Sequence, residues 1–431
     1  MRFLHGRRAR RHHRLRVRLH RRRGSAALLA VLGPGLLAGL SDDDPAGITT
    51  YSIMGAEHGY RLLWVLLAST LLLIAFHELA ARLGVMTGKG LLTLVRERHG
   101  RRTATLLLVP LLVANLGTLA AEFAGVAAAA GLAGVPRGPA VVAAAILVCA
   151  LVLGSGFHRV EHVLLALSAV FVTYVGAGLL ARPDVGATLD GLLVPGVDGA
   201  SRSALLAAVA CVGTTLAPWG LTFMQSYVAD KRLRPSELRY ERIDVATGAV
   251  LTGVIGAFVV VACAATLHPL GRTIEDASDA ALALEPLAGR MASLLFGCGL
   301  LGAALLAAAV VPLATAYAVS EAVGHEGRLD DPPSRARTFY GTYAGAVALA
   351  AGIVLVPAVP LVPVLFLTQA LNAILLLPIL VVVRRLAADP VLLGDRALRP
   401  AGRAGALAAT LLVAASVIAL GASALWSTSS G

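Results

Sequence analysis

The chain alternates long apolar stretches with short polar segments over most of its 431 residues. Most stretches run for about twenty residues, which is the length an α-helix needs to cross a hydrocarbon core of about 30 Å. The pattern therefore predicts an all-α integral membrane protein with eleven spans and no separate soluble domain. The expected spans are 26–56, 60–83, 104–132, 138–155, 161–181, 203–229, 243–267, 290–320, 338–356, 361–383 and 403–426. A short amphipathic surface helix is expected at Ser278–Gly289.

The composition excludes several classes of protein. Hydrophobic residues make up 57% of the chain and charged residues only 14%, which is too little charge to cover a soluble protein of this size. The four cysteines stand alone in apolar stretches, so neither a disulfide framework nor a zinc site is indicated. With no evident nucleophile, base or metal-ligand cluster, an enzyme is not expected, nor is a bound cofactor.

The net charge of +12 is concentrated at the N-terminus, where eleven of the 37 Lys and Arg residues lie within the first 23 positions. This tail, residues 1–24, has no aromatic side chain after Phe3 to stack on bases, so we expect it to contact anionic lipid headgroups and not nucleic acid. Most other basic residues fall in alternate connections. The asymmetry predicts a cytoplasmic N-terminus and a short external tail at 427–431.

The first span is interrupted by the sequence DDDPAG at residues 42–47. An acidic side chain inside an apolar span costs about 2.5–3.5 kcal/mol, so these groups must face water, a cation or a partner. Pro45 has no N–H and Gly47 loosens the chain, which leaves carbonyl groups near Asp44 free to bind an ion. An extracellular loop is the alternative, but it would leave residues 46–57 too short to span. We therefore predict a broken helix.

The sixth span carries a matching interruption, TTLAPWG at residues 214–220. Each break opens one half of a single transporter domain at 25–426. Matching breaks in two halves are typical of an inverted repeat with its binding site between the halves. We predict a repeat at 26–181, a second at 203–383 and an extra helix at 403–426.

Other polar residues within the spans have less specific roles. Glu122 is either a proton or ion relay or a structural partner of another helix. His77 and Glu78 are expected to pair internally and not to bind a metal. Gln369 and Asn372 share one helix face, where they either complete a coordination shell or make interhelical hydrogen bonds.

Four segments together resemble one transporter family. They are GPGLLAGLSDDDPAGITTYSIMGAEHGYRLLWVLL, the later ARLGVMTGKGLL, AEFAG around Glu122, and ELRYERID before the seventh span. They resemble the natural resistance-associated macrophage protein (Nramp) family across spans one to ten. The resemblance implies a LeuT-type fold, with five helices in each repeat and helices 1 and 6 broken. It also implies transport of divalent transition metals, often with protons.

The chain departs from the family at the expected metal site. The family has DPGN in span one, with Asp and Asn as ligands; here Asp44 is kept and Gly47 replaces the Asn. The family's Met-Pro-His in span six becomes Ala217-Pro218-Trp219, so the thioether is lost. The resemblance places the family's backbone-carbonyl ligand on Thr214.

The expected proton pathway is altered as well. The family's two histidines in span six correspond to Trp219 and Met224, and the acidic residue three before Glu122 is replaced by Leu119. These losses resemble the Nramp-related magnesium transporter branch, whose members look uncoupled from protons.

These features predict uptake of a divalent cation, Mg²⁺ first and Mn²⁺ second, by alternating access across a prokaryotic cytoplasmic membrane. Asp44 would be the charged anchor, and the Thr214 carbonyl and Thr215 hydroxyl would be neutral donors. The small Gly47 and Ala217 would leave room for a hydrated ion. The remaining candidate residues, Gln369 and Asn372, would hold the waters of this ion.

Two alternatives remain open at this point. One is a proton-coupled Mn²⁺ or Fe²⁺ importer that uses Glu122 in place of the missing histidines. The other is an organic-solute transporter on a LeuT-type fold, although Asp44 offers no cationic partner for a substrate carboxylate. In each case we expect a monomer.

Overall fold

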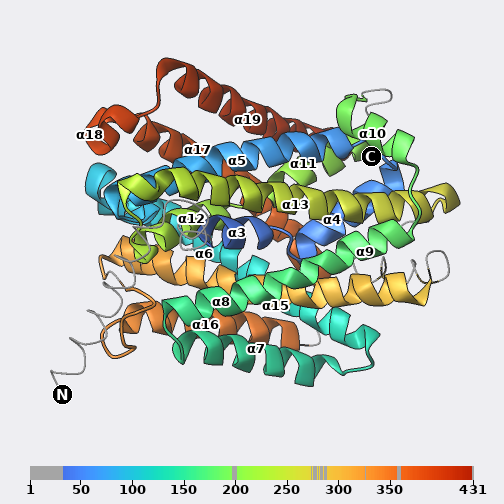
Figure 1. The fold of residues 1–431 in the computed structure, drawn as a ribbon, viewed down its shortest axis with the longest axis horizontal. Helices are drawn as coiled ribbons and strands as arrows, with labels where there is room; N and C mark the ends of the chain where they lie inside the picture. Colours follow the sequence, from blue (N-terminus) through green and yellow to red (C-terminus); the bar gives the residue numbers. More distant parts are fainter. Residues whose placement is uncertain are drawn as a thin grey trace.

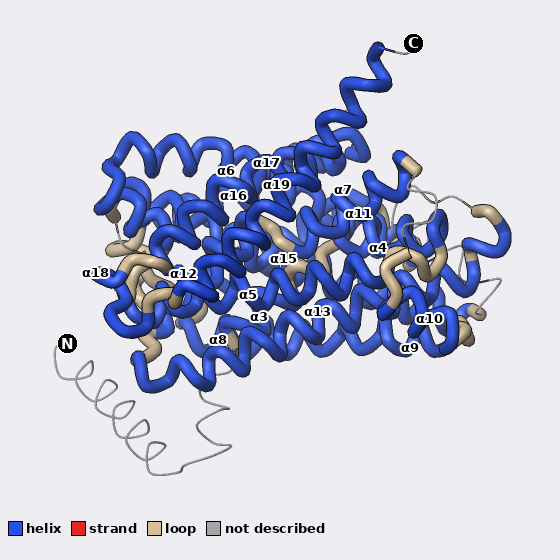
Figure 2. The backbone as a smooth tube through the Cα atoms, turned by 90° about the horizontal axis from the view of Figure 1, so that it is seen from above, coloured by secondary structure: helices blue, strands red, loops and turns tan. Residues whose placement is uncertain are grey.

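The computed structural model describes most of the membrane domain. Described are residues 33–196, 201–272, 289–325, 327–356 and 361–429, with isolated positions at Ile274, Asp279, Ala281 and Glu285. The basic tail at 1–24, most of the surface helix predicted at 278–289, and the end of the external tail at 430–431 lie outside these residues. The described part of the chain contains helices and loops but no strand (Figure 2).

Within the described residues, each of the eleven expected spans coincides with a helix or with helices that follow one another, and positions 26–32 of the first span lie outside them. The first repeat contains α3 (Pro34–Leu40), α4 (Pro45–His58), α5 (Leu63–Thr87), α6 (Leu91–Leu132), α7 (Arg137–Leu153), α8 (Phe157–Ser168), the 3-10 turn η1 (Ala169–Phe171) and α9 (Val172–Leu180). The second contains α11 (Arg202–Thr215), α12 (Pro218–Lys231), α13 (Leu238–Thr266), α15 (Arg290–Val323), α16 (Arg337–Leu355) and α17 (Leu361–Ala387). Outside the repeats are α10 (Val185–Leu193), α18 (Pro390–Leu393), the 3-10 turn η4 (Gly394–Arg396) and α19 (Pro400–Ser429). The 3-10 turns η2 (Pro235–Glu237) and η3 (His268–Leu270) flank α13 within the second repeat.

Seven helical segments of the described chain are long and apolar enough to cross a membrane, and one of them, Arg202–Lys231, contains the interruption between α11 and α12. Two further apolar helices are shorter, at Arg137–Leu153 and Pro400–Ala415. The largest difference from the predicted boundaries is at α6, which begins at Leu91 and not at 104 because the polar run between these positions is also helical. Gly100, with φ of +86°, kinks this extension.

The helices lie side by side along the long axis of the molecule (Figure 1). α12 and α18 lie near one end of the molecule and α10 lies near the other (Figure 1). The connections rich in Lys and Arg that follow α12 and include α18 are therefore at the opposite end from the connection that includes α10. The broken pairs α3/α4 and α11/α12 run through the middle, where α4 packs against both α13 and α11. The two breaks therefore lie inside the bundle and not at its lipid-facing surface.

Backbone-to-backbone packing holds α3 against α13. A methyl group on Gly248 would overlap the carbonyl of Gly35, and one on Gly39 would lie 2.7 Å from the Gly248 carbonyl carbon. Small residues let membrane helices approach this closely, so dispersion contacts replace the hydrophobic effect that lipid does not supply. This contact positions the short helix that leads into the first break.

We expect Gly248→Ala to destabilise the protein by about 1–3 kcal/mol, because the added methyl must push α3 away. Gly345 on α16 is the matched control, since nothing lies within 4 Å of a methyl group there. Gly345→Ala should leave stability unchanged or raise it by up to about 1 kcal/mol through helix propensity. Thermal unfolding of both variants in detergent measures the difference. Equal melting temperatures would contradict the packing argument.

Candidate metal site

Asp44 is held at the break by its own helix. It is the N-cap of α4, and its Oδ1 accepts a hydrogen bond of 2.6 Å from the Gly47 N–H. Asp is a favoured N-cap residue and Pro45 is suited to the first helical position, so the DPAG sequence itself starts this helix. The Asp44 side chain is buried, and its carboxylate lies at the positive end of the α4 dipole.

The second break contributes oxygen atoms opposite Asp44. α11 ends at Thr215 and α12 starts at Pro218, which has no N–H to donate to the Thr214 carbonyl four residues earlier. A methyl group on Gly47 would lie 3.3 Å from both the Asp44 Oδ1 and the Thr214 Oγ. The structure thus brings Asp44, Gly47 and the Thr214 hydroxyl together, and their role as metal ligands stays a prediction.

The predicted spare room at Gly47 is wrong for this conformation. A methyl group there would lie only 2.9 Å from the Asp42 carbonyl oxygen. The space that a side chain would occupy is filled by the backbone of the break, which folds closely against the first turn of α4. Ala217, the N-cap of α12, is buried and makes no side-chain capping hydrogen bond.

Thr215 has other partners than an ion. Its hydroxyl donates to the Cys211 carbonyl at 2.8 Å, and the Tyr51 hydroxyl lies 3.1 Å from the same oxygen. Thr214 is different, because its Oγ is buried and has no hydrogen-bond partner among the described residues. Thr214 is thus the more available of the two hydroxyl groups in this conformation.

Glu122 reaches the site from α6. A methyl group on Gly125, one turn later, would overlap the Pro45 ring, so α6 passes directly against the break. Glu122 is fully buried, its carboxyl group is a neighbour of Asp44, and neither of its oxygens has a donor in the described part of the chain. These contacts place Glu122 beside the site.

Of the two candidates on α17, the structure describes the side chain of Asn372. The Asn372 side chain is buried and donates to Thr118 on α6 at 3.2 Å, while its Oδ1 has no partner among the described residues. This interhelical hydrogen bond is one of the two roles that the sequence analysis gave for Asn372. The side chain of Gln369 lies outside the described residues. Its role, like that of the free Asn372 oxygen, stays a prediction.

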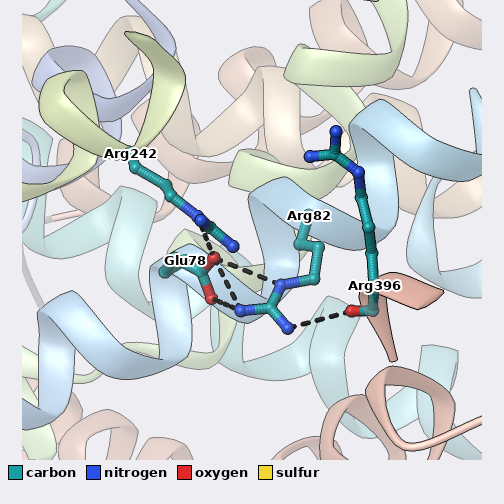
Figure 3. Close-up of polar contacts among 4 residues, drawn as sticks. All are labelled: Glu78, Arg82, Arg242 and Arg396. Atoms are coloured by element: carbon teal, nitrogen blue, oxygen red, sulfur yellow. Dashed lines mark hydrogen bonds and ion pairs between the residues drawn. The ribbon is translucent and has the colours of Figure 1, made fainter. Parts of the chain in front are cut away.

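Glu78 pairs internally, as predicted. Its carboxylate accepts from Arg82 on the same helix and from Arg242 on α13, each at 2.7 Å, and Arg82 also donates to the Arg396 carbonyl at 3.1 Å (Figure 3). Its neighbour His77 has no such partner, because its Nδ1 is buried without a hydrogen bond within the described helices. The two adjacent residues therefore have different environments.

Sequence analysis missed a buried charged group at one end of the bundle. Lys231 on α12 donates to Glu161 on α8 at 2.7 Å, and both side chains are buried. Asp244 on α13 accepts from the backbone N–H groups of Gly33 and Gly35, at 3.0 and 2.7 Å. The sequence contained one signal for this group: Glu241 and Asp244 in ERID are three residues apart, which puts both acids on one helix face.

The described residues include no group of three or more His, Cys, Asp or Glu side chains arranged to hold a metal ion. Where the two breaks meet, the described oxygen atoms are the Asp44 carboxylate and the Thr214 hydroxyl, with the Glu122 carboxyl group beside them. Such donors suit a hard cation that keeps part of its water.

Comparison with known proteins assigns the family. The model of the natural resistance-associated macrophage protein-like family, Nramp, matches residues 35–423, which include both breaks and Glu122. The chain belongs to the Nramp family. Nramp membership places it among membrane transporters and not among enzymes, as the composition indicated.

Two curated relatives are both named divalent metal cation transporter MntH. The relative from Deinococcus radiodurans is 33% identical over 309 residues, which are 68% of this chain and 69% of the relative. The relative from Burkholderia ambifaria is 32% identical over 292 residues, which are 65% of this chain and 66% of that one. The matched part thus spans about two thirds of each relative.

Solved structures confirm the predicted LeuT-type fold. The Eremococcus coleocola manganese transporter, crystallised with an aromatic bis-isothiourea compound, superposes with a TM-score of 0.75 over 92% of this chain and 87% of its own, at 20% identity. MhsT, crystallised with L-phenylalanine, gives 0.63 over 91% and 98%, at 15% identity. At these identities the likeness concerns the fold alone.

Proposed function

We propose that this Nramp protein takes up a divalent metal cation, Mg²⁺ in preference to Mn²⁺, by alternating access across the cytoplasmic membrane of a prokaryote. The observation that carries the proposal is the meeting of the two helix breaks at Asp44, Gly47 and Thr214. The relatives named divalent metal cation transporters support the general class of substrate.

The preference for Mg²⁺ follows from the ligand chemistry. Sulfur ligands suit soft or borderline metals, whereas Mg²⁺ binds oxygen and gives up its waters reluctantly. At the broken helices Ala217 offers no thioether, and Asp44 is the carboxylate fixed at the N-terminus of α4. Because the space at Gly47 is filled here, the hydrated ion would enter when the breaks separate during the transport cycle.

The membrane potential is a sufficient driving force for this uptake. An interior-negative potential favours entry by about 2.3 kcal/mol per charge per 100 mV, and by about twice that for a dication. We propose that no proton is coupled, since Leu119, Trp219 and Met224 are buried and cannot carry one at neutral pH. We also propose a monomer with the N-terminus inside and the basic tail on anionic lipid.

A proton-coupled Mn²⁺ or Fe²⁺ importer is the second candidate. The observation that favours it is the buried Glu122 carboxyl group beside Asp44. An organic-solute transporter has less support, because the two acidic groups would repel a substrate carboxylate and no cationic side chain of the described residues bonds to either.

Uptake by purified protein in liposomes tests the function. A potential is clamped with valinomycin, and entry of Mg²⁺, Mn²⁺ and Ca²⁺ is measured together with the internal pH. We expect potential-driven Mg²⁺ uptake without metal-dependent acidification. Acidification that disappears in Glu122→Gln would select the proton-coupled importer, and the absence of any divalent uptake would reject both.

Ala217→Met should shift preference from Mg²⁺ toward Mn²⁺ by about tenfold, because it restores a thioether at the start of α12. This single change is cleaner than one that includes Gly47→Asn, since a side chain at Gly47 would meet the Asp42 carbonyl. Ala217→Leu controls for size without sulfur. Competition between the two ions during uptake gives the ratio, and an identical ratio in Met, Leu and parent proteins would show that sulfur does not decide selectivity.

A further inference from the structure

The aspartates of the first break face different neighbours. Asp44 faces Gly47 and Thr214, whereas Asp42 lies against the first turn of α12. A methyl group on Gly220 would lie 3.1 and 3.7 Å from the two carboxyl oxygens of Asp42 and 3.6 Å from the His77 Nε2. Groups from the break, α5 and α12 therefore converge on one point beside Gly220, separate from the atoms around Gly47.

The Asp42 carboxyl group and the His77 ring are buried, each 1% exposed. Neither oxygen of Asp42 has a hydrogen-bond partner among the described residues. On the His77 ring the nitrogen without a partner there is Nδ1, while Nε2 is the nitrogen near Gly220. The charged groups that act on Asp42 are Asp43 and Asp44, which repel its negative charge. Burial of an ionised carboxylate without a partner costs several kcal/mol in a membrane interior, so Asp42 either takes up a proton or binds a cation.

Two metal-free explanations fit the contacts less well. Asp42 could cap α12, whose N-terminus is close, but no N–H of the described backbone donates to it. Asp42 could also pair with a basic residue, as Glu78 does one position after His77, but both Arg82 and Arg242 bind Glu78. A small positively charged ligand would satisfy both Asp42 oxygens. It would also explain the glycine at position 220, because a side chain there would occupy the space of the ligand.

We propose that Asp42 and His77 form a second divalent-cation subsite over Gly220, next to the one at Asp44. The inference rests on the proposed function, because it places the subsite on the same ion path. A carboxylate with an imidazole nitrogen suits Mn²⁺ and other borderline metals better than Mg²⁺. The two subsites therefore differ in chemistry. The Asp42 subsite favours Mn²⁺, and the oxygen-rich Asp44 subsite favours Mg²⁺.

The test uses the full-length protein loaded with Mn²⁺ and electron spin echo spectroscopy, which detects nitrogen bound directly to the metal. We expect a nitrogen signal in the parent protein and in Asp44→Asn, and its loss in His77→Gln. Asp42→Asn and Gly220→Ala should each weaken Mn²⁺ binding in the Asp44→Asn background by at least about tenfold. Gly220→Ala keeps both ligands and only fills the point between them.

The outcomes separate this inference from the proposed function. A nitrogen signal dependent on His77, in a protein without divalent uptake, would support the subsite and reject the transport proposal. Normal uptake with no nitrogen signal, or with a signal that persists in His77→Gln, would overturn the subsite alone. Unchanged Mn²⁺ affinity in both Asp42→Asn and Gly220→Ala would also overturn it. Melting temperatures of each variant show that the loss of binding is not loss of folding.

Discussion

Asp44→Asn should abolish divalent uptake while the protein stays folded. The substitution removes the carboxylate charge at the meeting point of the breaks, and losing one partner of a buried charged contact costs about 2–5 kcal/mol. That cost corresponds to a loss of more than about 30-fold in ion affinity. The fold is expected to survive because Asn is as good an N-cap as Asp for the Gly47 N–H.

The measurement is uptake of Mg²⁺ and Mn²⁺ into liposomes at a fixed potential. Asp184→Asn is the matched control, because Asp184 caps α10 in the same way, through the Ala187 N–H at 3.0 Å, but is exposed and far from the breaks in sequence. The control should transport normally. Parent-like uptake of both ions by folded Asp44→Asn would remove Asp44 from the role of anchor.

Lys231→Met should be the most destabilising substitution that we predict outside the site. Lys231 bonds Glu161 at 2.7 Å and is also a favourable neighbour of Asp244 and Glu241. Without the ammonium group, these acids would lose their buried counter-charge, and Glu161 would keep only the exposed His158 at 3.8 Å. Breaking a buried pair in this way costs about 3–5 kcal/mol.

Thermal unfolding in detergent measures this loss. The exposed pair Lys89–Glu97 has the same 2.7 Å distance, so Lys89→Met controls for the ion pair itself and should cost less than about 1 kcal/mol. The double variant Lys231→Met with Glu161→Leu should recover part of the stability, because one of the stranded charges is removed with its partner. Equal losses for Lys231→Met and Lys89→Met would show that burial adds nothing here.

The sequence by itself determined the membrane class, the helical spans and the two breaks. Apolar runs of spanning length, and proline inside two of them, act through local rules: a lipid-embedded backbone must be helical, and proline cannot donate. The pairing of the breaks across the halves was therefore predictable, as were Asp44 at the N-terminus of α4 and the absence of a thioether at Ala217.

Only the tertiary structure decided what surrounds each polar group. At residues 41–44 the helix is interrupted, so helical periodicity could not tell that Asp42 and His77 both lie near Gly220, whereas Asp44 and Thr214 both lie near Gly47. The contact between the Thr215 and Tyr51 hydroxyl groups joins segments far apart in the chain, and the space expected at Gly47 is filled by the Asp42 carbonyl of the same break.

The ion pairs illustrate the same physical reason. Lys231 and Glu161 are 70 positions apart, and Glu78 and Arg242 are 164 apart, so no sequence pattern links them. The choice of partner depends on which helix ends the bundle brings together after burial of the apolar faces. Local sequence therefore determines which segments are helical and where they break, while the packing of those helices determines which buried acidic groups have partners and which, like Asp42, have none among the described residues.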